Sequence, residues 1–346
     1  MPTPKKNESE NAFVQRCISF VVKNEGKKPD QAYAICKGLW DKSQKDVNSD
    51  SVPYVKKNST LEYLNERKAA GDSRFKRSRR RKPPRMLHPV SIERSYQSLL
   101  LSMVNEWQKI TSETLEGLIP LLAKEARQDQ WSEGAERLIA QLRLKIEEKP
   151  FPINTVSQQI GERTAEWNDK QWRKVMKATL GVDILQSQPW LKDQLNNFVS
   201  QNVTLIKDLQ SQTLDRIEGT VQRGFAQGLR HEEIMKQIVG RDKSVFSKAK
   251  SRARLIARDQ VSKLNGNLTR LKQKEIGVTH YIWRTSEDDR VRPTHRANNG
   301  KIFSWDDPPI ETGHPGQDYQ CRCWAEAYFG EEFATEEQIK AFKAAA

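Results

Sequence analysis

Two histidines and two cysteines near the C-terminus are the residues of this chain best suited to chemistry. They are His295, His314, Cys321 and Cys323. Imidazole and thiolate suit tetrahedral zinc, and a small module often needs a metal to supplement its core. If the two cysteines occupy alternate positions of a strand, both sulfur atoms lie on one side of it. The sequence therefore allows a zinc site. The alternative is that these side chains hold loops by hydrogen bonds and packing, because Cys-x-Cys is not the usual zinc-ligand spacing.

A nearby group of acidic residues allows a different chemistry. Asp288 and Asp289 together with His295 could hold a metal ion and activate water, as in a metal-dependent nuclease. The simpler interpretation is that Asp289 forms ion pairs with Arg290 and Arg292 and supports a turn. The sequence shows no phosphate-cradling glycine loop, no nucleophile elbow and no other paired carboxylates. We therefore expect a protein without enzymatic activity, and keep the nuclease as an alternative.

A helix and a short strand-rich segment must position these residues. A helical pattern with a narrow apolar seam runs from about residue 248 to 275. Residues 281–285 then alternate as a strand does, and residues 298–300 (Asn-Asn-Gly) predict a tight turn. A short helix is expected at the end of the chain, opened by Thr335. The residues expected to shape this module are Trp283, Asp289, Arg290, Arg292, Gly300 and Arg322.

The remainder of the chain is expected to be helical and extended. Only 36% of its 346 residues are apolar, and the mean hydropathy is −0.81, so there is little core per residue. The fold class we expect is mainly α with a small C-terminal α+β domain. The predicted segments are a helical hairpin (1–45), a basic linker or arm (46–89), a helical region for protein contacts (90–247), the α+β domain (248–330) and a tail helix (331–346).

The cysteines and the apolar runs bear on where such a chain is made. The four cysteines are too few and too spread for a disulfide framework. Cys17 and Cys36 fall on the apolar faces of the expected hairpin, where we interpret them as small buried hydrophobic residues. No apolar run approaches the roughly 20 residues of a membrane span, and there is no secretory signal pattern. These features predict a soluble protein made in a reducing cytosol.

Positive charge is concentrated in two places. The net charge is +14, yet residues 67–85 carry ten Lys/Arg and one acid, and residues 241–274 carry eleven and two. Each segment thus has a net charge of +9, and the rest of the chain sums to −4. This distribution favours contact with a polyanion such as DNA. The residues predicted to contact DNA are Arg77, Arg79, Arg80, Arg81, Lys82, Lys250, Arg254 and Arg258. A solvated linker, a targeting signal or an acidic protein partner are the alternatives.

The C-terminal pattern resembles a known family, the phage Mu F-like head-morphogenesis proteins. The resemblance covers about residues 253–329. It rests on Leu255 to Gln260, Gly277, Trp283-Arg284-Thr285, Asp289 to Arg292, His295, Gly300, Phe303, His314-Pro315 and Cys321-Arg322-Cys323. The pair Asp259-Gln260 departs from the Thr-Glu more usual in the family.

The resemblance implies a minor capsid protein of a bacteriophage virion. Such a protein lies inside the head near the portal, contacts the portal, major capsid or scaffold proteins and packaged double-stranded DNA, and is present in several copies. It acts in head assembly, DNA packaging or DNA ejection. A plain DNA-binding adaptor is a further alternative, although it would not need so long a helical region.

Overall fold

The structure is a computed structural model that describes residues 10–25, 32, 36–37, 60–72, 82–125, 131–181 and 186–345. These residues form ten helices and three strands. The chain divides into two compact units, Met1–Ser59 and Thr60–Ala346, which are described separately.

In the N-terminal unit, helix α1 (Glu10–Glu25) carries an apolar face at helical spacing. Phe13, Cys17 and Val21 on this face are fully buried and pack with Ala32 and Cys36. Cys17 and Cys36 form a disulfide. The predicted burial of both cysteines is confirmed, but the interpretation as unlinked hydrophobic residues is wrong, because the two apolar faces bring the sulfur atoms together. Most of the second predicted helix lies outside the described residues.

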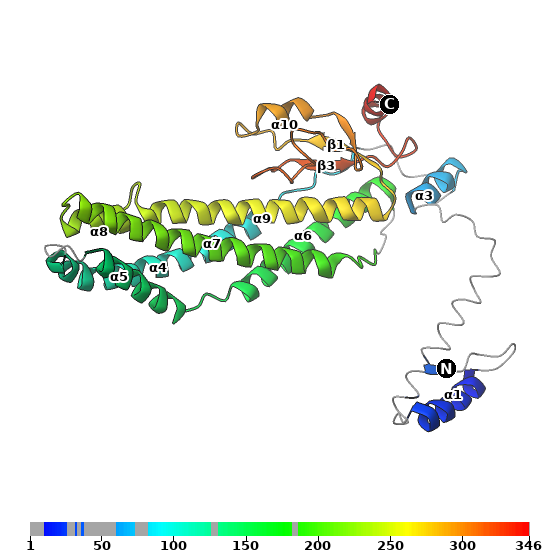
Figure 1. Cartoon of the computed structure of the whole chain (residues 1–346). Coiled ribbons are helices and arrows are strands. Elements are labelled where there is room, and N and C mark those ends of the chain that lie inside the picture. The colour runs from blue at the N-terminus through cyan, green and yellow to red at the C-terminus, as the bar shows by residue number, and fades with distance from the viewer. Residues whose placement is uncertain are drawn as a thin grey trace. The chain divides into compact units, whose positions relative to one another are not determined.

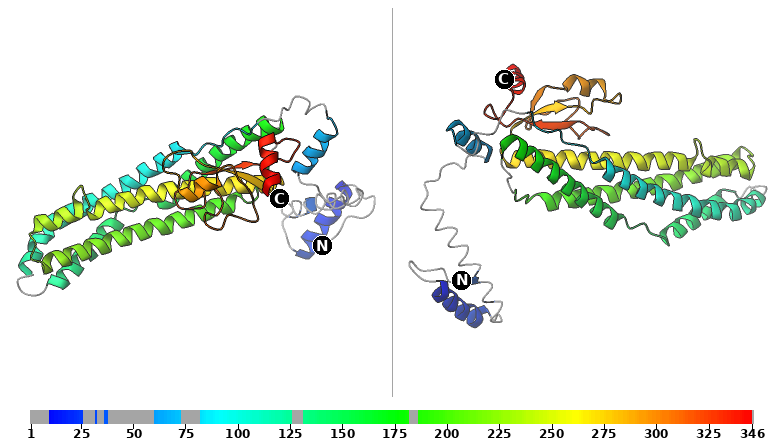
Figure 2. Two further views of the ribbon diagram at one scale, coloured as in Figure 1. Left: turned by 90° about the horizontal axis from the view of Figure 1, so that it is seen from above. Right: turned by 180° about the vertical axis from the view of Figure 1, so that it is seen from behind.

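Six helices of the second unit form an elongated bundle, shown in Figure 1 and from two further directions in Figure 2. They are α4 (Val90–Glu125), α5 (Trp131–Glu147), α6 (Ile153–Leu180), α7 (Leu191–Ala226), α8 (His231–Val239) and α9 (Val245–Glu275). The predicted break at residues 149–152 separates α5 from α6. Gly181 ends α6 with a φ of 74°, which a residue without a Cβ adopts without strain.

One continuous apolar core runs through this bundle, because α4, α7 and α9 each turn a helical stripe inward. Leu100 and Val104 of α4, Ile217 of α7 and Ala253 and Leu268 of α9 are all fully buried in it. The boundary predicted between residues 247 and 248 therefore falls inside a packed unit, close to the beginning of α9.

The C-terminal module is built on a small antiparallel sheet with the order β2-β1-β3. Its strands are β1 (His280–Arg284), β2 (Ile302–Ser304) and β3 (Trp324–Ala327), and its helices are α10 (Pro293–Asn298) and α11 (Glu336–Ala345). Tyr281 pairs with Phe303 on one side and with Ala327 on the other. The predicted mainly α fold with a small C-terminal α+β part is confirmed.

Helix α3 (Thr60–Ala69) also belongs to this end of the unit. The amide of Leu61 donates to the carbonyl of Ile276, and the Asn65 side chain donates to the carbonyl of Phe329. In the part of the chain that the structure describes, every helix is too short or too polar to cross a membrane.

Candidate metal centre

The loop that precedes β3 lies directly against helix α9. The Cα of Gly316 would be 3.2 Å, and the carbonyl oxygen of Pro315 2.8 Å, from a Cβ at Gly266 in α9. The Gln320 amide donates to the buried Asp259 carboxylate of the same helix at 3.0 Å. A helix glycine and a helix carboxylate therefore fix the course of the loop immediately before Cys321.

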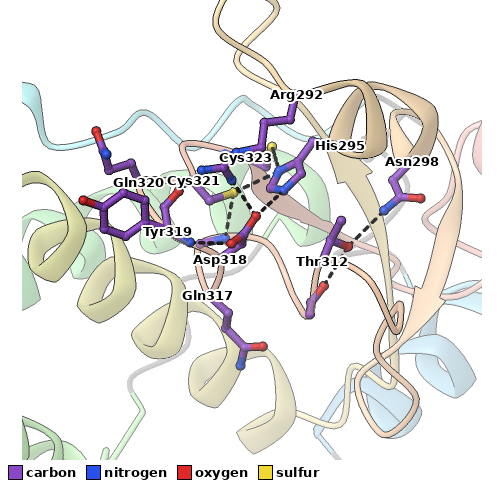
Figure 3. A network of polar contacts seen from close by, with 12 residues as sticks. Arg292, His295, Asn298, Thr312, Gln317, Asp318, Tyr319, Gln320, Cys321 and Cys323 are labelled. Atoms are coloured by element: carbon purple, nitrogen blue, oxygen red, sulfur yellow. Dashed lines mark hydrogen bonds and ion pairs between the residues drawn. The ribbon is translucent and has the colours of Figure 1, made fainter. Parts of the chain in front are cut away.

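His295, Cys321 and Cys323 converge at the centre of the module (Figure 3). The Nδ1 atom of His295 lies 3.4 Å from Cys323 Sγ and 3.5 Å from Cys321 Sγ. On the other side of the ring, Nε2 lies 2.8 Å from the Asp318 carboxylate, which Arg292 also contacts at 2.5 Å. Cys321 accepts the amide protons of Gly316 and Cys323, each at 3.4 Å.

These contacts favour one negative sulfur. The pKa of Cys321 is lowered to about 5, chiefly because Cys323 donates a hydrogen bond to it, and also because His295 and two amides donate to it. The pKa of the Cys323 thiol is raised, because its own proton is shared with Cys321 and the site is buried. The pKa of His295 is raised by its hydrogen bond with Cys321 and by Asp318, although burial opposes this.

His314 does not join this group. Its Nδ1 atom forms a hydrogen bond of 2.9 Å with the buried Tyr281 hydroxyl, and its ring lies 4.8 Å from that of Trp305. Burial and the charge of Arg270 lower the pKa of His314 to about 4, so the imidazole is neutral. The structure thus brings together three of the four ligands predicted from the sequence and gives the fourth a packing role.

The two cysteines precede β3 and do not lie within a strand. The predicted reason for their convergence, alternation along a strand, is therefore wrong. Their sulfur atoms meet because the loop turns between Gly316 and Cys321, where the chain passes over Gly266. Gln320, with a φ of 53°, takes the left-handed conformation at this turn.

Arginines and acids surround the cluster in a pattern that differs from the predicted one. Asp288, and not Asp289, forms the ion pairs, with Arg322 and Arg290. Arg292 pairs with Asp318 and also donates to the carbonyl of Tyr319. Asp289 is exposed. Both aspartates follow each other in a turn, so the sequence did not reveal which one faces the arginines.

Trp283 and Gly300 occupy the structural positions expected of them. Trp283 is fully buried in β1, and its ring meets that of His295 edge-on at 5.4 Å. The Gly300 amide donates to the carbonyl of Trp283 at 2.8 Å, and its φ of 83° forms the turn after α10.

A pocket of about 150 Å³ opens beside the sulfur atoms. His295, Cys321 and Cys323 contribute to its wall. The other lining residues are Arg258, Ser286, Arg290, Val291, Arg292, Gln320 and Arg322. A ligand atom bound to the sulfur cluster on this side would therefore meet guanidinium groups.

The residues predicted to contact DNA have different surroundings. Arg254 is exposed and Lys250 half-buried on α9, and Lys82 is exposed. Arg258 instead pairs with the buried Glu93 of α4 at 3.0 Å and donates to Gln320, so it connects the bundle to the cysteine loop. Its predicted place in a DNA-binding row is corrected. Arg77, Arg79, Arg80 and Arg81 lie outside the described residues.

Sequence reasoning missed Asp318, Asp259 and Glu93. The only signal for Asp318 is its place three residues before Cys321, where a carboxylate can reach a nearby imidazole. Nothing in the sequence pairs Glu93 with Arg258, because 165 positions separate them.

Comparison with known proteins assigns this segment to a family. Residues 215–326 match the family described as Phage Mu protein F like protein. An uncharacterized protein of Haemophilus influenzae is 36% identical over 151 residues, which are 43% of this chain and 33% of that protein. The Mu-like prophage FluMu F protein of the same organism is 28% identical over 151 residues, 39% of this chain and 36% of that protein.

The matched part thus spans about a third of the length of each of these relatives. No solved structure matches the chain significantly. The family match begins within α7 and ends in β3, so it includes the histidine, both cysteines and the helix beneath them. Residues 215–326 are therefore a phage Mu F-like domain.

Proposed function

We propose that this chain is a minor head protein of a tailed bacteriophage that acts in head morphogenesis. The observation that carries the proposal is the family match of residues 215–326, which is supported by the similarity to a protein named for a Mu-like prophage. In this proposal the protein belongs to the virion, inside the head near the portal vertex, and is present in several copies.

The helical bundle is the proposed surface for the portal, major capsid or scaffold proteins. A groove of about 860 Å³ lies between α6 and α7, with Leu191, Leu195 and Val199 among its lining residues. Apolar side chains with a polar surround are typical of a protein-binding surface. The groove therefore gives the proposed protein contact a definite location.

The proposed head location can be tested on particles. We expect quantitative mass spectrometry of heads purified after induction of the phage to find several copies of this chain, and deletion of its gene to reduce the yield of DNA-filled heads. A chain that is absent from both empty and filled heads, and whose deletion leaves the yield unchanged, would overturn the proposal.

We further propose that packaged DNA contacts the beginning of α9, with a role in packaging or ejection. Arg241, Lys243, Lys248, Arg252 and Arg254 are exposed there. Binding of this kind is non-specific and weakens with salt, because each phosphate that a basic side chain neutralises releases counterions. The basic arm with Arg77, Arg79, Arg80 and Arg81 is the second proposed contact.

This proposed DNA surface has a matched control on the same bundle. The double variant Lys250→Ala/Arg254→Ala should reduce the slope of log affinity against log salt by about 0.9 for each phosphate that is no longer neutralised. The variant Lys174→Ala/Lys177→Ala removes the same charge from exposed positions of α6 and should leave the slope unchanged. Equal effects of both variants would show that only net charge matters and would remove α9 from the proposal.

We propose that this role involves no catalysis. Asp288 is engaged by Arg322 and Arg290, and His295 by Asp318 and the cysteines, so two of the three residues of the nuclease hypothesis already have protein partners. Cleavage of DNA with Mg²⁺ or Mn²⁺ that is abolished by Asp289→Ala or His295→Ala would instead establish a nuclease.

A further inference from the structure

The spacing of the sulfur and nitrogen atoms in the C-terminal module fits a metal site. In a tetrahedral zinc site with Zn–N of about 2.0 Å and Zn–S of about 2.3 Å, the ligand nitrogen and sulfur atoms are about 3.6 Å apart. The two distances from His295 Nδ1 to sulfur are 3.4 and 3.5 Å. All three ligand atoms lie within 4.8 Å of one another. One ion can therefore reach all three without rearrangement of the loop.

The groups around the cluster prepare these ligands for a metal. Asp318 accepts from the Nε2 side of His295, so the lone pair of Nδ1 points toward the sulfur atoms. A carboxylate on the far nitrogen is the usual partner of a metal-binding histidine, since it fixes the ring and raises its basicity. The amides of Gly316 and Cys323 donate to Cys321 Sγ and stabilise a thiolate there.

The choice of metal follows from the ligands. Two thiolates and one imidazole suit zinc, whereas magnesium and calcium take oxygen ligands. A protein with three ligands leaves a fourth position for water or another small ligand. His314 does not fill it, because its Nδ1 is bonded to Tyr281. The pocket lined by Arg290, Arg292 and Arg322 provides the open side.

We propose that His295, Cys321 and Cys323 bind one zinc ion per chain, with Asp318 as a positioning residue and the fourth position open to the arginine-lined pocket. The zinc ion links α10 to the loop before β3, two short pieces of chain with little core of their own. This inference goes beyond the proposed head function and does not depend on it.

The first test uses the unaltered full-length chain, purified without a histidine tag, incubated with zinc and then gel-filtered. We expect one zinc per chain by elemental analysis. Cobalt in place of zinc should give the visible absorption of a tetrahedral site and sulfur-to-metal charge-transfer bands. Peptide mapping should show Cys321 and Cys323 protected from alkylation until a chelator removes the metal.

Variants identify the ligands. Cys323→Ser and His295→Gln should lose stoichiometric zinc, whereas His314→Gln, a change in the same module, should retain it. Asp318→Asn should weaken zinc affinity about 10- to 100-fold.

Several results would overturn the site. Full-length protein without stoichiometric zinc, whose cysteines alkylate equally fast with and without chelator, would do so without any variant. Fast alkylation of Cys321 alone would then indicate a reactive thiol paired with His295. Loss of zinc in His314→Gln with retention in Cys323→Ser would refute the ligand set.

Discussion

Replacement of Gly266 by alanine tests whether the close approach of α9 to the cysteine loop determines the structure of the site. A Cβ at this position would lie 2.8 Å from the Pro315 carbonyl oxygen and 3.2 Å from Gly316 Cα. Ordinary contact begins near 3.4 Å, so the loop must retreat by 3.4 − 2.8, or about 0.6 Å. Both obstacles are backbone atoms, which cannot rotate away as the end of a side chain can.

The expected change in unfolding free energy has two opposing parts. Alanine in place of glycine in a helix gains about 1 kcal/mol, whereas overpacking costs about 1–3 kcal/mol. The net change for Gly266→Ala is therefore between about zero and 2 kcal/mol of destabilisation. Gly117→Ala in α4 is the matched control, because no atom lies within 4 Å of its added Cβ. It should gain about 1 kcal/mol.

Urea unfolding followed by far-ultraviolet circular dichroism measures both variants, since most of the signal comes from the helices of the second unit. The informative quantity is the difference between the two alanine variants, expected at about 1–3 kcal/mol with Gly266→Ala the less stable. If Gly266→Ala is as stable as Gly117→Ala, the loop does not rest on the helix as the structure has it.

Two further predictions concern buried polar groups. Because burial and Arg270 lower the pKa of His314 to about 4, the unfolded chain binds a proton below about pH 6.5 that the folded chain does not. Stability from this group is therefore lost as pH falls from about 6.5 to 4, by about 3 kcal/mol in all, and the loss should disappear in His314→Gln; an imidazole NMR titration of His314 centred near 6.5 would contradict this. Glu326 is fully buried and binds Arg284 through two hydrogen bonds of 2.9 Å. Glu326→Ala should cost about 3–5 kcal/mol in urea unfolding because it leaves Arg284 unpaired, whereas Arg284→Met/Glu326→Leu should cost much less; equal losses would show that the ion pair does not matter.

Local pattern predicted the elements of this protein well. Apolar spacing identified the long helices, and alternation from Tyr281 to Thr285 identified β1. Thr335 was predicted to open the last helix, and its hydroxyl indeed accepts the amide proton of Gln338. These features depend on residues a few positions apart, which a sequence displays directly.

Contacts between distant segments could not be read from the sequence. The disulfide of Cys17 and Cys36 depends on how two apolar faces meet. His314 has the same chemistry as His295, and only the position of Tyr281 removes it from the metal cluster. The row Lys250, Arg254 and Arg258 looked uniform along α9, but Glu93 of another helix neutralises its last member.

Helix α9 makes the phage Mu F-like domain inseparable from the helices that precede it. One side of the helix is part of the bundle core, where Ala253 and Leu268 are buried. Another side carries Gly266 and Asp259, which hold the cysteine loop. Arg258 joins the two by bonding both Glu93 and Gln320. The family match begins at residue 215, yet Glu93 and the α4 side of the core lie before it. The matched segment is thus defined by its sequence but folded by contacts from outside it, and a force or a binding event on the bundle acts directly on the loop that holds Cys321.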